Sequence, residues 1–524
     1  MSFLDLFVIG SYLAAMLALS IRLGRHQQSP SDYYVGGRTL PAWALAVSTM
    51  ATQSSANSFV GVPAFVALVP GGGLSWLQYE LAVPLALLLV MWVLVPVFRG
   101  LGLISLYEYL ELRFDRATRL LLSAVFLLSR AAASGVALYA ASLVVQVATG
   151  WPMLACLMAM GVVTVVYDVV GGMRAVVWTD VVQMVVLVVG VLLCARVALD
   201  VAGGAAGVLE SVDASRLRAV QWGHGLGDGV RAPFWGFLIG GLVLYAAYYG
   251  VDQSQVQRQL SAAGVAQARR VLAINALARF PLTLMYCGLG LALAGAWAHS
   301  PILQQAVPGP RWDELVPRFI ELHLPAGLRG LLVAAVLAAA MSSLDSALNA
   351  LSAATMRDFL ETRIAASRQL LASRLCTTLW GVVVVGFGAW AAELGGSVIE
   401  AINRVGAWFY GPLLAAFGCG ILDARATGRG VRVGVVAGLV VNVVLWAWLG
   451  ERLFWMWWNV SGLVAAALVT AWVSRLGAAP AAPPPPGTWV GWRELRRGLV
   501  DLGGWAWACV AGFAAMMAVV PTLG

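Results

Sequence analysis

Oxygen-bearing side chains recur at helical spacing inside one long apolar stretch of the chain. Ser342, Asp345, Ser346 and Asn349 would share one face of a helix, with Ser343 beside them. Hydroxyl, carboxylate and carbonyl oxygens replace the water shell of a hard cation such as sodium, by the same argument that holds for Ca²⁺ and Mg²⁺. The serines could instead bond back to their own helix, but that alternative does not account for Asp345. We therefore predict an ion site on this face.

A second polar run lies in the apolar stretch near residues 41–66. Its members are hydroxyl and amide side chains between Pro41 and Pro63, namely Ser48, Thr49, Thr52, Gln53, Ser54, Ser55, Asn57 and Ser58. Such a run suits a continuous lipid-facing helix poorly. A broken helix instead exposes backbone carbonyls and half-helix ends, which hold an ion or a substrate. A polar seam between packed helices is the alternative, and this run alone leaves both open.

Further polar and ionisable side chains occur at membrane depth, where an ionisable group costs at least about 2.5 kcal/mol. They are Glu80, Asp180, Asp252, Gln253, Arg279, Asn403 and Arg404. Each suggests a pathway or an internal ion pair, although Thr179 and Asp180 would also cap a helix well. Arg130 is long enough to reach the membrane interface from its stretch.

The composition defines the class of protein that carries these groups. Of 524 residues, 61% are hydrophobic and 11% are charged, with a mean hydropathy of +0.84. A soluble protein has roughly 25% charged residues, so a cytosolic enzyme is excluded. The net charge of +8 comes from arginine alone and indicates membrane topology rather than nucleic-acid binding. The six cysteines lie in apolar stretches without ligand spacing, so we predict neither disulfides nor a bound metal among them.

A helix needs about 20 apolar residues to cross the hydrocarbon, and about fourteen stretches meet that length. They lie near 2–22, 41–66, 77–98, 118–147, 151–169, 179–199, 233–252, 268–297, 327–355, 371–392, 397–422, 431–449, 453–474 and 503–521. The connections between them are too short for a separate catalytic domain. The sequence therefore predicts an all-α polytopic membrane protein whose function resides inside its bundle.

Arginine placement predicts the orientation of the spans. Most arginines fall in the connections that are cytoplasmic if the N-terminus lies outside, so both termini are predicted outside. The first stretch lacks a basic leading region and a clear cleavage site, and we interpret it as a retained span. A chain rich in Ala, Val, Gly and Arg without lysine suggests a GC-rich bacterial genome and hence the inner (plasma) membrane.

Four motifs follow one another between Asp32 and about Asp358. They are DYYVGGR at 32–38, GGMRAVVWTDVVQ at 171–183, Asp252-Gln253 through Gln257-Arg258, and LPAGLRG at 324–330 leading to MSSLDS at 341–346. In this order they resemble the sodium/solute symporter family, and four ordered motifs are far more specific than one glycine signature. Beyond residue 425 the similarity is confined to the hydrophobic pattern.

The resemblance implies a LeuT-like core of five plus five helices related by an inverted repeat. The core would occupy 41–425, with its halves at 41–200 and 233–425. A leading helix and loop at 1–40 would precede it. Three trailing helices at 426–524, with a Pro-rich spacer at 480–487, would follow it.

The resemblance also implies the sodium ligands. Sodium would bind the backbone carbonyls of Ala51, Ser54 and Ala339 and the hydroxyls of Ser342 and Ser343. A second sodium, present in some members, would use Asp180, Asp345 and Ser346. Asp345 departs from the usual neutral residue; it either strengthens the second site or is protonated beside Asp180, because two close carboxylates rarely both ionise.

The substrate residues implied by the family are Gln53, Ser58, Glu80, Asp252, Gln253 and Asn403. Sugar-carrying members have an amide where Ser58 stands, which argues against a sugar. Arg279 replaces a common lysine. The segment 249–258 looks most like the branch that carries monocarboxylates, vitamins and iodide, which favours an anionic substrate.

The number of sodium ions decides how far an anion could be accumulated. At about 100 mV an entering charge gains about 2.3 kcal/mol, and a tenfold gradient adds about 1.4 kcal/mol. Transport of one sodium with one monovalent anion moves no net charge. Only the free energy of the sodium gradient, about 1.4 kcal/mol for a tenfold gradient, then drives accumulation. A second sodium would add about 3.7 kcal/mol. We therefore hypothesise that an anion-accumulating carrier needs the site of Asp180 and Asp345.

The sequence as a whole predicts a sodium-coupled secondary symporter that imports a small organic solute by alternating access. Proton coupling on the same scaffold is one alternative, and a solute sensor that does not transport is another. An enzyme is not expected, because no nucleophile–base constellation occurs within the spans. The expected partners are the solute, sodium ions and the lipid bilayer, with no nucleic acid and no cofactor beyond the transported sodium. The identity of the solute and the oligomeric state do not follow from the sequence.

Overall fold

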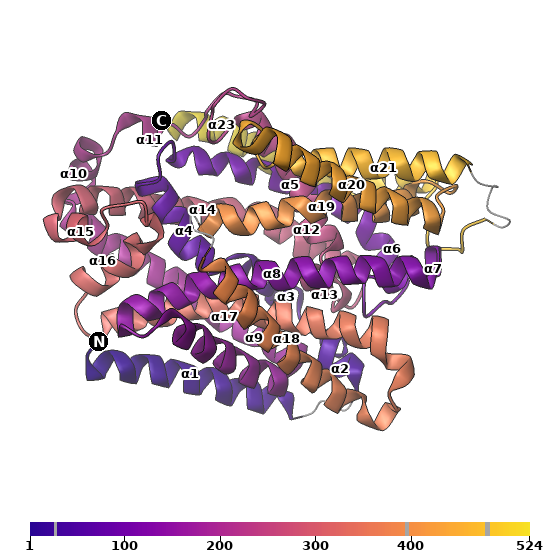
Figure 1. The fold of residues 1–524 in the computed structure, drawn as a ribbon, viewed down its shortest axis with the longest axis horizontal. Helices are drawn as coiled ribbons and strands as arrows, with labels where there is room; N and C mark the ends of the chain where they lie inside the picture. The colour runs from indigo at the N-terminus through magenta and orange to yellow at the C-terminus, as the bar shows by residue number, and fades with distance from the viewer. Residues whose placement is uncertain (26–28, 394–397, 477–482, 524) are drawn as a thin grey trace.

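The computed structural model describes residues 1–25, 29–393, 398–476 and 483–523, and helices make up the regular structure of this part apart from one isolated bridge between Leu226 and Leu453. Most of the long helices run along one common direction and pack side by side (Figure 1). α1 lies along one edge of the bundle, and α20 and α21 lie along the opposite edge (Figure 1). The chain begins and ends at the same end of the bundle, which agrees with the predicted orientation.

Eleven helical segments in the described part are long and apolar enough to cross a membrane, so the chain is a multi-pass membrane protein. Most of these spans contain one long helix each, which are α1 (Phe3–Gly24), α8 (Arg116–Thr149), α9 (Met153–Val201), α14 (Val265–His299), α17 (Leu328–Ala354), α18 (Gln369–Ala391), α19 (Val398–Leu422), α20 (Gly428–Leu449), α21 (Trp457–Leu476) and α23 (Gly504–Val519). One further span, Leu74–Gly100, contains α5 (Ala82–Leu89) and α6 (Val95–Gly100).

Two further spans are interrupted halfway. α3 (Ala42–Gln53) and α4 (Ala56–Ala67) are separated by Ser54 and Ser55, and α12 (Gly241–Val251) and α13 (Gln253–Leu260) are separated by Asp252. Side chains restart the second helix of each pair: Ser55 accepts from the N–H of Asn57, and Asp252 accepts from the N–H of Ser254 at 2.9 Å. The prediction of a broken helix near residues 41–66 is confirmed.

The helix α9 contains two spans. Its 49 residues would extend for about 74 Å, far beyond the roughly 30 Å of the hydrocarbon core. Gly172, with φ 56° and ψ −169°, interrupts the helical backbone between the predicted fifth and sixth spans. The part before Gly172 runs antiparallel to α18, since Leu157 lies near Gly388 and Val165 near Gly381. With this division and the two interrupted spans, the structure agrees with about fourteen spans.

The helix α17 is the central element, because almost all of its apolar window is buried. It packs against α1, α3, α8, α9 and α18. Asp5 near the start of α1 holds the first turn of α17, accepting from the N–H groups of Gly327 at 2.8 Å and Gly330 at 2.9 Å. Further along α1, the hydroxyl of Ser20 donates to the carbonyl of Tyr167 over 2.6 Å. The leading helix is therefore joined to both α17 and α9.

Short helices cover the two ends of the bundle. They are α2 (Pro30–Val35), α7 (Glu108–Arg113), α10 (Gly204–Ser211), α11 (Ala214–Leu217), α15 (Pro301–Ala306), α16 (Leu315–His323) and α22 (Trp492–Leu502). Figure 1 places α10, α15 and α16 at the end that carries the termini, and α2 and α7 at the opposite end. The functional groups lie between these ends, where α3, α4, α12 and α13 are interrupted.

Candidate functional site

The break between α3 and α4 faces the serines of α17. The hydroxyl of Ser342 donates to the carbonyls of Ala51 at 3.1 Å and Ala339 at 3.0 Å. The hydroxyl of Ser343 donates to the carbonyl of Thr52 at 2.8 Å. All of these residues are buried. The structure thus brings together four of the five residues expected to bind sodium, and the fifth, Ser54, follows α3 directly and is also buried.

This arrangement offers uncharged oxygens at the end of a helix. The carbonyls of Ala51 and Thr52 belong to the last turn of α3, where the carbonyls of a helix have no partner within it. The helix dipole adds partial negative charge at the same end and favours a nearby cation. Carbonyl and hydroxyl oxygens around a helix end therefore fit a monovalent hard cation.

The residues expected to form a second sodium site are also close to one another. Ser346 donates to Asp345 through its backbone N–H at 2.5 Å, and Tyr167 donates its phenol proton to the same carboxylate. Asp180 accepts from the hydroxyl of Ser48 at 2.5 Å. The guanidinium of Arg258 lies 3.3 Å from Asp180 and also donates to Ser346. A fixed positive charge thus lies at the position proposed for a second cation.

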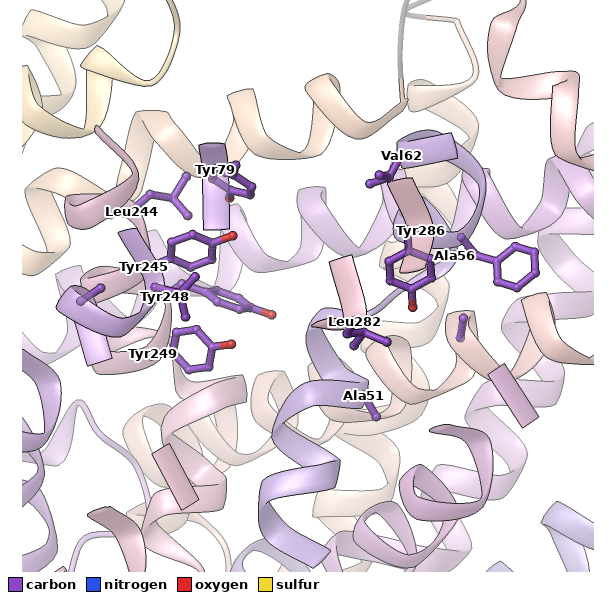
Figure 2. Packing of buried hydrophobic residues seen from close by; sticks show 14 of the residues in the cluster. Ala51, Ala56, Val62, Tyr79, Leu244, Tyr245, Tyr248, Tyr249, Leu282 and Tyr286 are labelled. Atoms are coloured by element: carbon purple, nitrogen blue, oxygen red, sulfur yellow. The ribbon is translucent and has the colours of Figure 1, made fainter. Parts of the chain in front are cut away.

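A cavity of about 110 Å³ lies beside the break of α3 and α4. Four of the six predicted substrate residues line it, namely Gln53, Ser58, Glu80 and Asn403. Figure 2 shows Tyr79 and Tyr248 on one side of the opening and Tyr286 and Val62 on the other. Several tyrosine hydroxyls point toward this space (Figure 2). The cavity therefore has aromatic walls with polar tips.

Two buried ion pairs lie at this cavity. Arg279 contacts Glu80 at 2.7 Å, and both line the cavity. Arg130 lies 3.5 Å from Asp252, which also accepts from the hydroxyl of Tyr410 at 3.1 Å. Asp252 does not line the cavity itself; it contacts Arg130 and Tyr410, which do. The Nε–H groups of Arg130 and Arg279 have no hydrogen-bond acceptor within the described ranges, so both arginines retain a donor near the cavity.

The structure does not place Gln253 at the cavity. Its amide donates to the carbonyl of Ile104 at 2.9 Å and accepts from the N–H of Leu106 at 2.7 Å. Gln253 is the first residue of α13, after the chain has turned at Asp252, so its side chain is directed at the loop before α7 instead. Gln253 joins the broken helix to that loop.

Sequence reasoning missed two arginines of the site. Arg130 is not a side chain that reaches the interface; it is buried against Asp252 and lines the cavity. Arg258 belongs to a recognised motif but received no role, and it is completely buried. The sequence contained a signal for both arginines. A buried arginine requires a carboxylate partner, and the acidic residues predicted at membrane depth included Asp252 and Asp180.

Comparisons with known proteins indicate the family of the chain. The model of the sodium:solute symporter family matches residues 33–438. The human sodium-coupled monocarboxylate transporter 1 is 32% identical over 464 residues, covering 86% of this chain and 74% of that protein. The human sodium/iodide cotransporter is 31% identical over 436 residues, covering 82% of this chain and 66% of that protein.

Solved structures of other transporters have a similar fold. A substrate-bound, outward-open Na⁺-coupled sialic acid symporter superposes with a TM-score of 0.81 at 26% identity, covering 91% of this chain and 99% of that one. Mhp1, a nucleobase-cation-symport-1 family transporter, superposes with a TM-score of 0.53 at 14% identity, covering 90% and 99%, and supports the fold alone. The function is sodium-coupled symport of a small solute. The chain belongs to the sodium:solute symporter family.

Proposed function

We propose that this symporter imports a small organic anion, with a monocarboxylate as the best candidate, together with sodium. The observation that supports this most directly is Arg130, a buried guanidinium that lines the cavity, has an Nε–H without an acceptor in the described part of the chain, and contacts Asp252 at a long 3.5 Å beside the ring of Tyr248. A guanidinium binds a carboxylate through parallel N–H bonds, which is the strongest hydrogen-bonded pairing available to a small anion.

The two arginines of the cavity have different roles in this proposal. Arg279 is held by Glu80 at 2.7 Å, and Glu80 also accepts from Tyr245 at 3.4 Å, so this pair stabilises the wall. Arg130 is held less tightly by its acid than Arg279 is, and in this proposal it binds the carboxylate of the solute. Gln53, Ser58 and Asn403 supply the remaining polar contacts.

The size of the cavity supports a solute of few heavy atoms. Its volume is about 110 Å³. Aromatic walls suit a short apolar body behind the charged group. The names of the two human relatives specify a monocarboxylate and iodide, both of which are anions.

The transported sodium occupies the break of α3 and α4 in this proposal. Ala51, Ser54 and Ala339 contribute carbonyl oxygens, and Ser342 and Ser343 contribute hydroxyls. The protein acts as a carrier in the inner membrane rather than as an enzyme, and it uses no cofactor beyond this sodium. In this proposal the leading helix and loop occupy 1–40, the inverted-repeat core occupies 41–425, and the three trailing helices occupy 426–524.

Tracer uptake into proteoliposomes tests the proposal. A panel of monocarboxylates, amino acids and sugars is offered under an inward sodium gradient and, separately, under a proton gradient. We expect sodium-driven accumulation of a monocarboxylate that is lost in Ser343→Ala. Accumulation driven by protons alone, or accumulation of a sugar in place of the acids, would contradict it.

A further inference from the structure

The helix α22 (Trp492–Leu502) lies at the cytoplasmic end of the bundle, between the spans α21 and α23. Two hydrogen bonds fix the segment before it at that end. The hydroxyl of Tyr109 on α7 donates to the carbonyl of Thr488 at 2.8 Å. The N–H of Val490 donates to the carbonyl of Ile421, near the end of α19, at 2.8 Å. α7 lies at the end opposite to the termini (Figure 1), which the placement of the arginines assigns to the cytoplasm.

One side of α22 packs against the span Leu74–Gly100. The indole N–H of Trp92 donates to the carbonyl of Leu495 at 2.7 Å. Leu502 follows seven residues later, so it lies on the same face of the helix, and it is buried. This face of α22 is therefore held by the protein.

The adjoining side of α22 is apolar but is not covered by protein. Trp492, Leu499 and Val500 are 68%, 44% and 79% exposed. A helix at the end of a membrane bundle with such an open apolar side lies in the interface, where these side chains contact the upper part of the acyl chains. Tryptophan is enriched at this level of the bilayer. The exposed apolar side of α22 therefore faces lipid.

Three exposed arginines border this apolar side. Arg493 and Arg497 are four residues apart and lie on one face of the helix. The guanidinium of Arg496 lies over the ring of Trp492, 5.3 Å from its centre. Among the described residues, none of the three arginines forms an ion pair with a carboxylate. Their charges are therefore open to a partner outside the chain.

The two acids of α22 have other partners. Glu494 accepts from the N–H of Gly491 at 2.8 Å and so caps the start of the helix. Asp501 interacts electrostatically with Arg269 of α14, whose Nε donates to the carbonyl of Met91 at 3.2 Å. The charge that α22 presents at the membrane surface is therefore positive.

We propose that α22 is a binding site for anionic phospholipids of the cytoplasmic leaflet, in which the three arginines contact the phosphate groups and the exposed apolar side chains contact the acyl chains. A guanidinium binds phosphate through paired N–H donors, and a basic amphipathic helix is attracted to an anionic lipid surface. Free phosphate would satisfy the arginines alone, whereas a lipid also covers Trp492, Leu499 and Val500. The inference goes beyond the proposed function and does not depend on which solute is carried.

Bound lipid would also support the wall of the solute cavity. α22 packs on the span Leu74–Gly100, and this span contributes Trp76, Tyr79 and Glu80 to the cavity lining. A ligand that binds only the folded protein stabilises it. The lipid would thus hold α22 against a span that positions residues of the transport site.

Titration of the purified protein in neutral detergent with short-chain phosphatidylglycerol tests the proposal, with bound lipid counted by native mass spectrometry. No solute is present, so the result is independent of the proposed function. We expect Arg493→Gln combined with Arg497→Gln to weaken binding roughly 30-fold, about fivefold for each arginine. Short-chain phosphatidylcholine, which has the same chains but no net charge, should bind weakly to wild type. The soluble headgroup glycerophosphate should bind weakly as well, because it has no acyl chains.

Arg425→Gln combined with Arg429→Gln is the matched control. These arginines are also exposed, four residues apart and at the start of a span, α20, but outside α22. We expect this control to bind phosphatidylglycerol as wild type does. The lysine pair Arg493→Lys and Arg497→Lys should retain most of the affinity, because the charge is kept.

Three results would overturn the inference. They are equal affinity of wild type and the α22 double variant for phosphatidylglycerol, an equal loss in the control, and glycerophosphate binding as tight as that of the lipid. If the double variant does not fold, Arg493→Gln and Arg497→Gln are measured separately. Unchanged affinity in both single variants would overturn the inference in the same way.

Discussion

The hydroxyl of Ser343 lies 2.8 Å from the carbonyl of Thr52, which joins the central helix α17 to the last turn of α3. Beside it, Ser342 contacts the carbonyl of Ala51 in the same way. Three of the oxygens proposed to bind sodium, those of Ala51, Ser342 and Ser343, thus also join these two helices. Because an ion placed between them would contact both helices, sodium binding and the packing of α3 on α17 depend on each other.

Ser343→Ala should weaken sodium binding at this break. The substitution removes one proposed ligand, and a polar contact to a charged group contributes about 1.5–3 kcal/mol. We expect the sodium concentration for half-maximal uptake to rise by roughly 10- to 150-fold. Ser142→Ala is the matched control, because Ser142 is equally buried on α8 and away from α3. Equal sodium dependence in the two variants would contradict the assignment.

Arg130→Gln should impair solute binding more than protein stability. A hydrogen bond to a charged group contributes about 1.5–3 kcal/mol, so we expect the KM for a carboxylate to rise by about 10- to 150-fold. The measurement is initial uptake at several solute concentrations and saturating sodium. Arg130→Lys keeps the charge but not the paired donors, and its KM should be intermediate. An unchanged KM in both variants would show that the solute does not contact Arg130.

Arg119→Gln should destabilise the protein strongly. Asp358 lies four residues after the end of α17 with its side chain fully buried, and it contacts Arg119 at 2.8 Å and Ser123 at 2.6 Å. Removing one partner of a buried ion pair costs about 3–5 kcal/mol, because the remaining charge has no partner. The free energy of unfolding in detergent checks this value.

The pair of Arg475 and Asp423 supplies the control for that measurement. These side chains are 3.3 Å apart but 51% and 27% exposed. Exposed pairs contribute about 1 kcal/mol or less, so Arg475→Gln should change the stability little. A similar loss of unfolding free energy in Arg119→Gln and Arg475→Gln would mean that burial does not determine how strongly the pair of Arg119 and Asp358 stabilises the protein.

The stability contributed by Asp115 should depend on pH. Burial raises the pKa of this carboxyl, but hydrogen bonds from Arg432 and Thr118 lower it more, and the pKa lies below its ordinary value of 3.8. The contribution is therefore complete above pH 3.8 and is lost as the pH falls through the lowered pKa. Asp115 caps α8, so Asp115→Ala should cost about 0.5–2 kcal/mol at neutral pH.

Thermal melting of wild type and Asp115→Ala across the acidic range measures this dependence. The difference in melting temperature should be constant above about pH 5 and should shrink at lower pH, since the protonated carboxyl loses its ion pair with Arg432. A difference that grows as the pH falls would contradict the sign of the shift.

Much of the architecture could be predicted because it depends on local pattern. The apolar lengths defined the spans, and the polar run between Pro41 and Pro63 defined the break of α3 and α4. Gly172 was also recognisable as part of a motif, although its role as the break inside α9 was not. The serines of α17 were predicted to face the break, and the structure places them there.

Pairing between distant segments could not be predicted in the same way. Arg130 and Asp252 are separated by 122 positions, and Arg258 and Asp180 by 78, so no local spacing connects them. The direction of Gln253 depends on the turn at Asp252, which a hydrophobic pattern does not describe. Where two segments meet inside a bundle, the chemistry of each side chain is set by a neighbour that only the fold provides.

The contact between Asp5 and the first turn of α17 has a practical consequence for producing the protein. Asp5 also accepts from the N–H of Ser2 at 2.8 Å, so the first residues of the chain are part of the support for α17. A purification tag or fluorescent reporter fused directly ahead of Ser2 would crowd this carboxylate. Fusions for expression screening or microscopy therefore belong at the other end of the chain, or behind a flexible spacer.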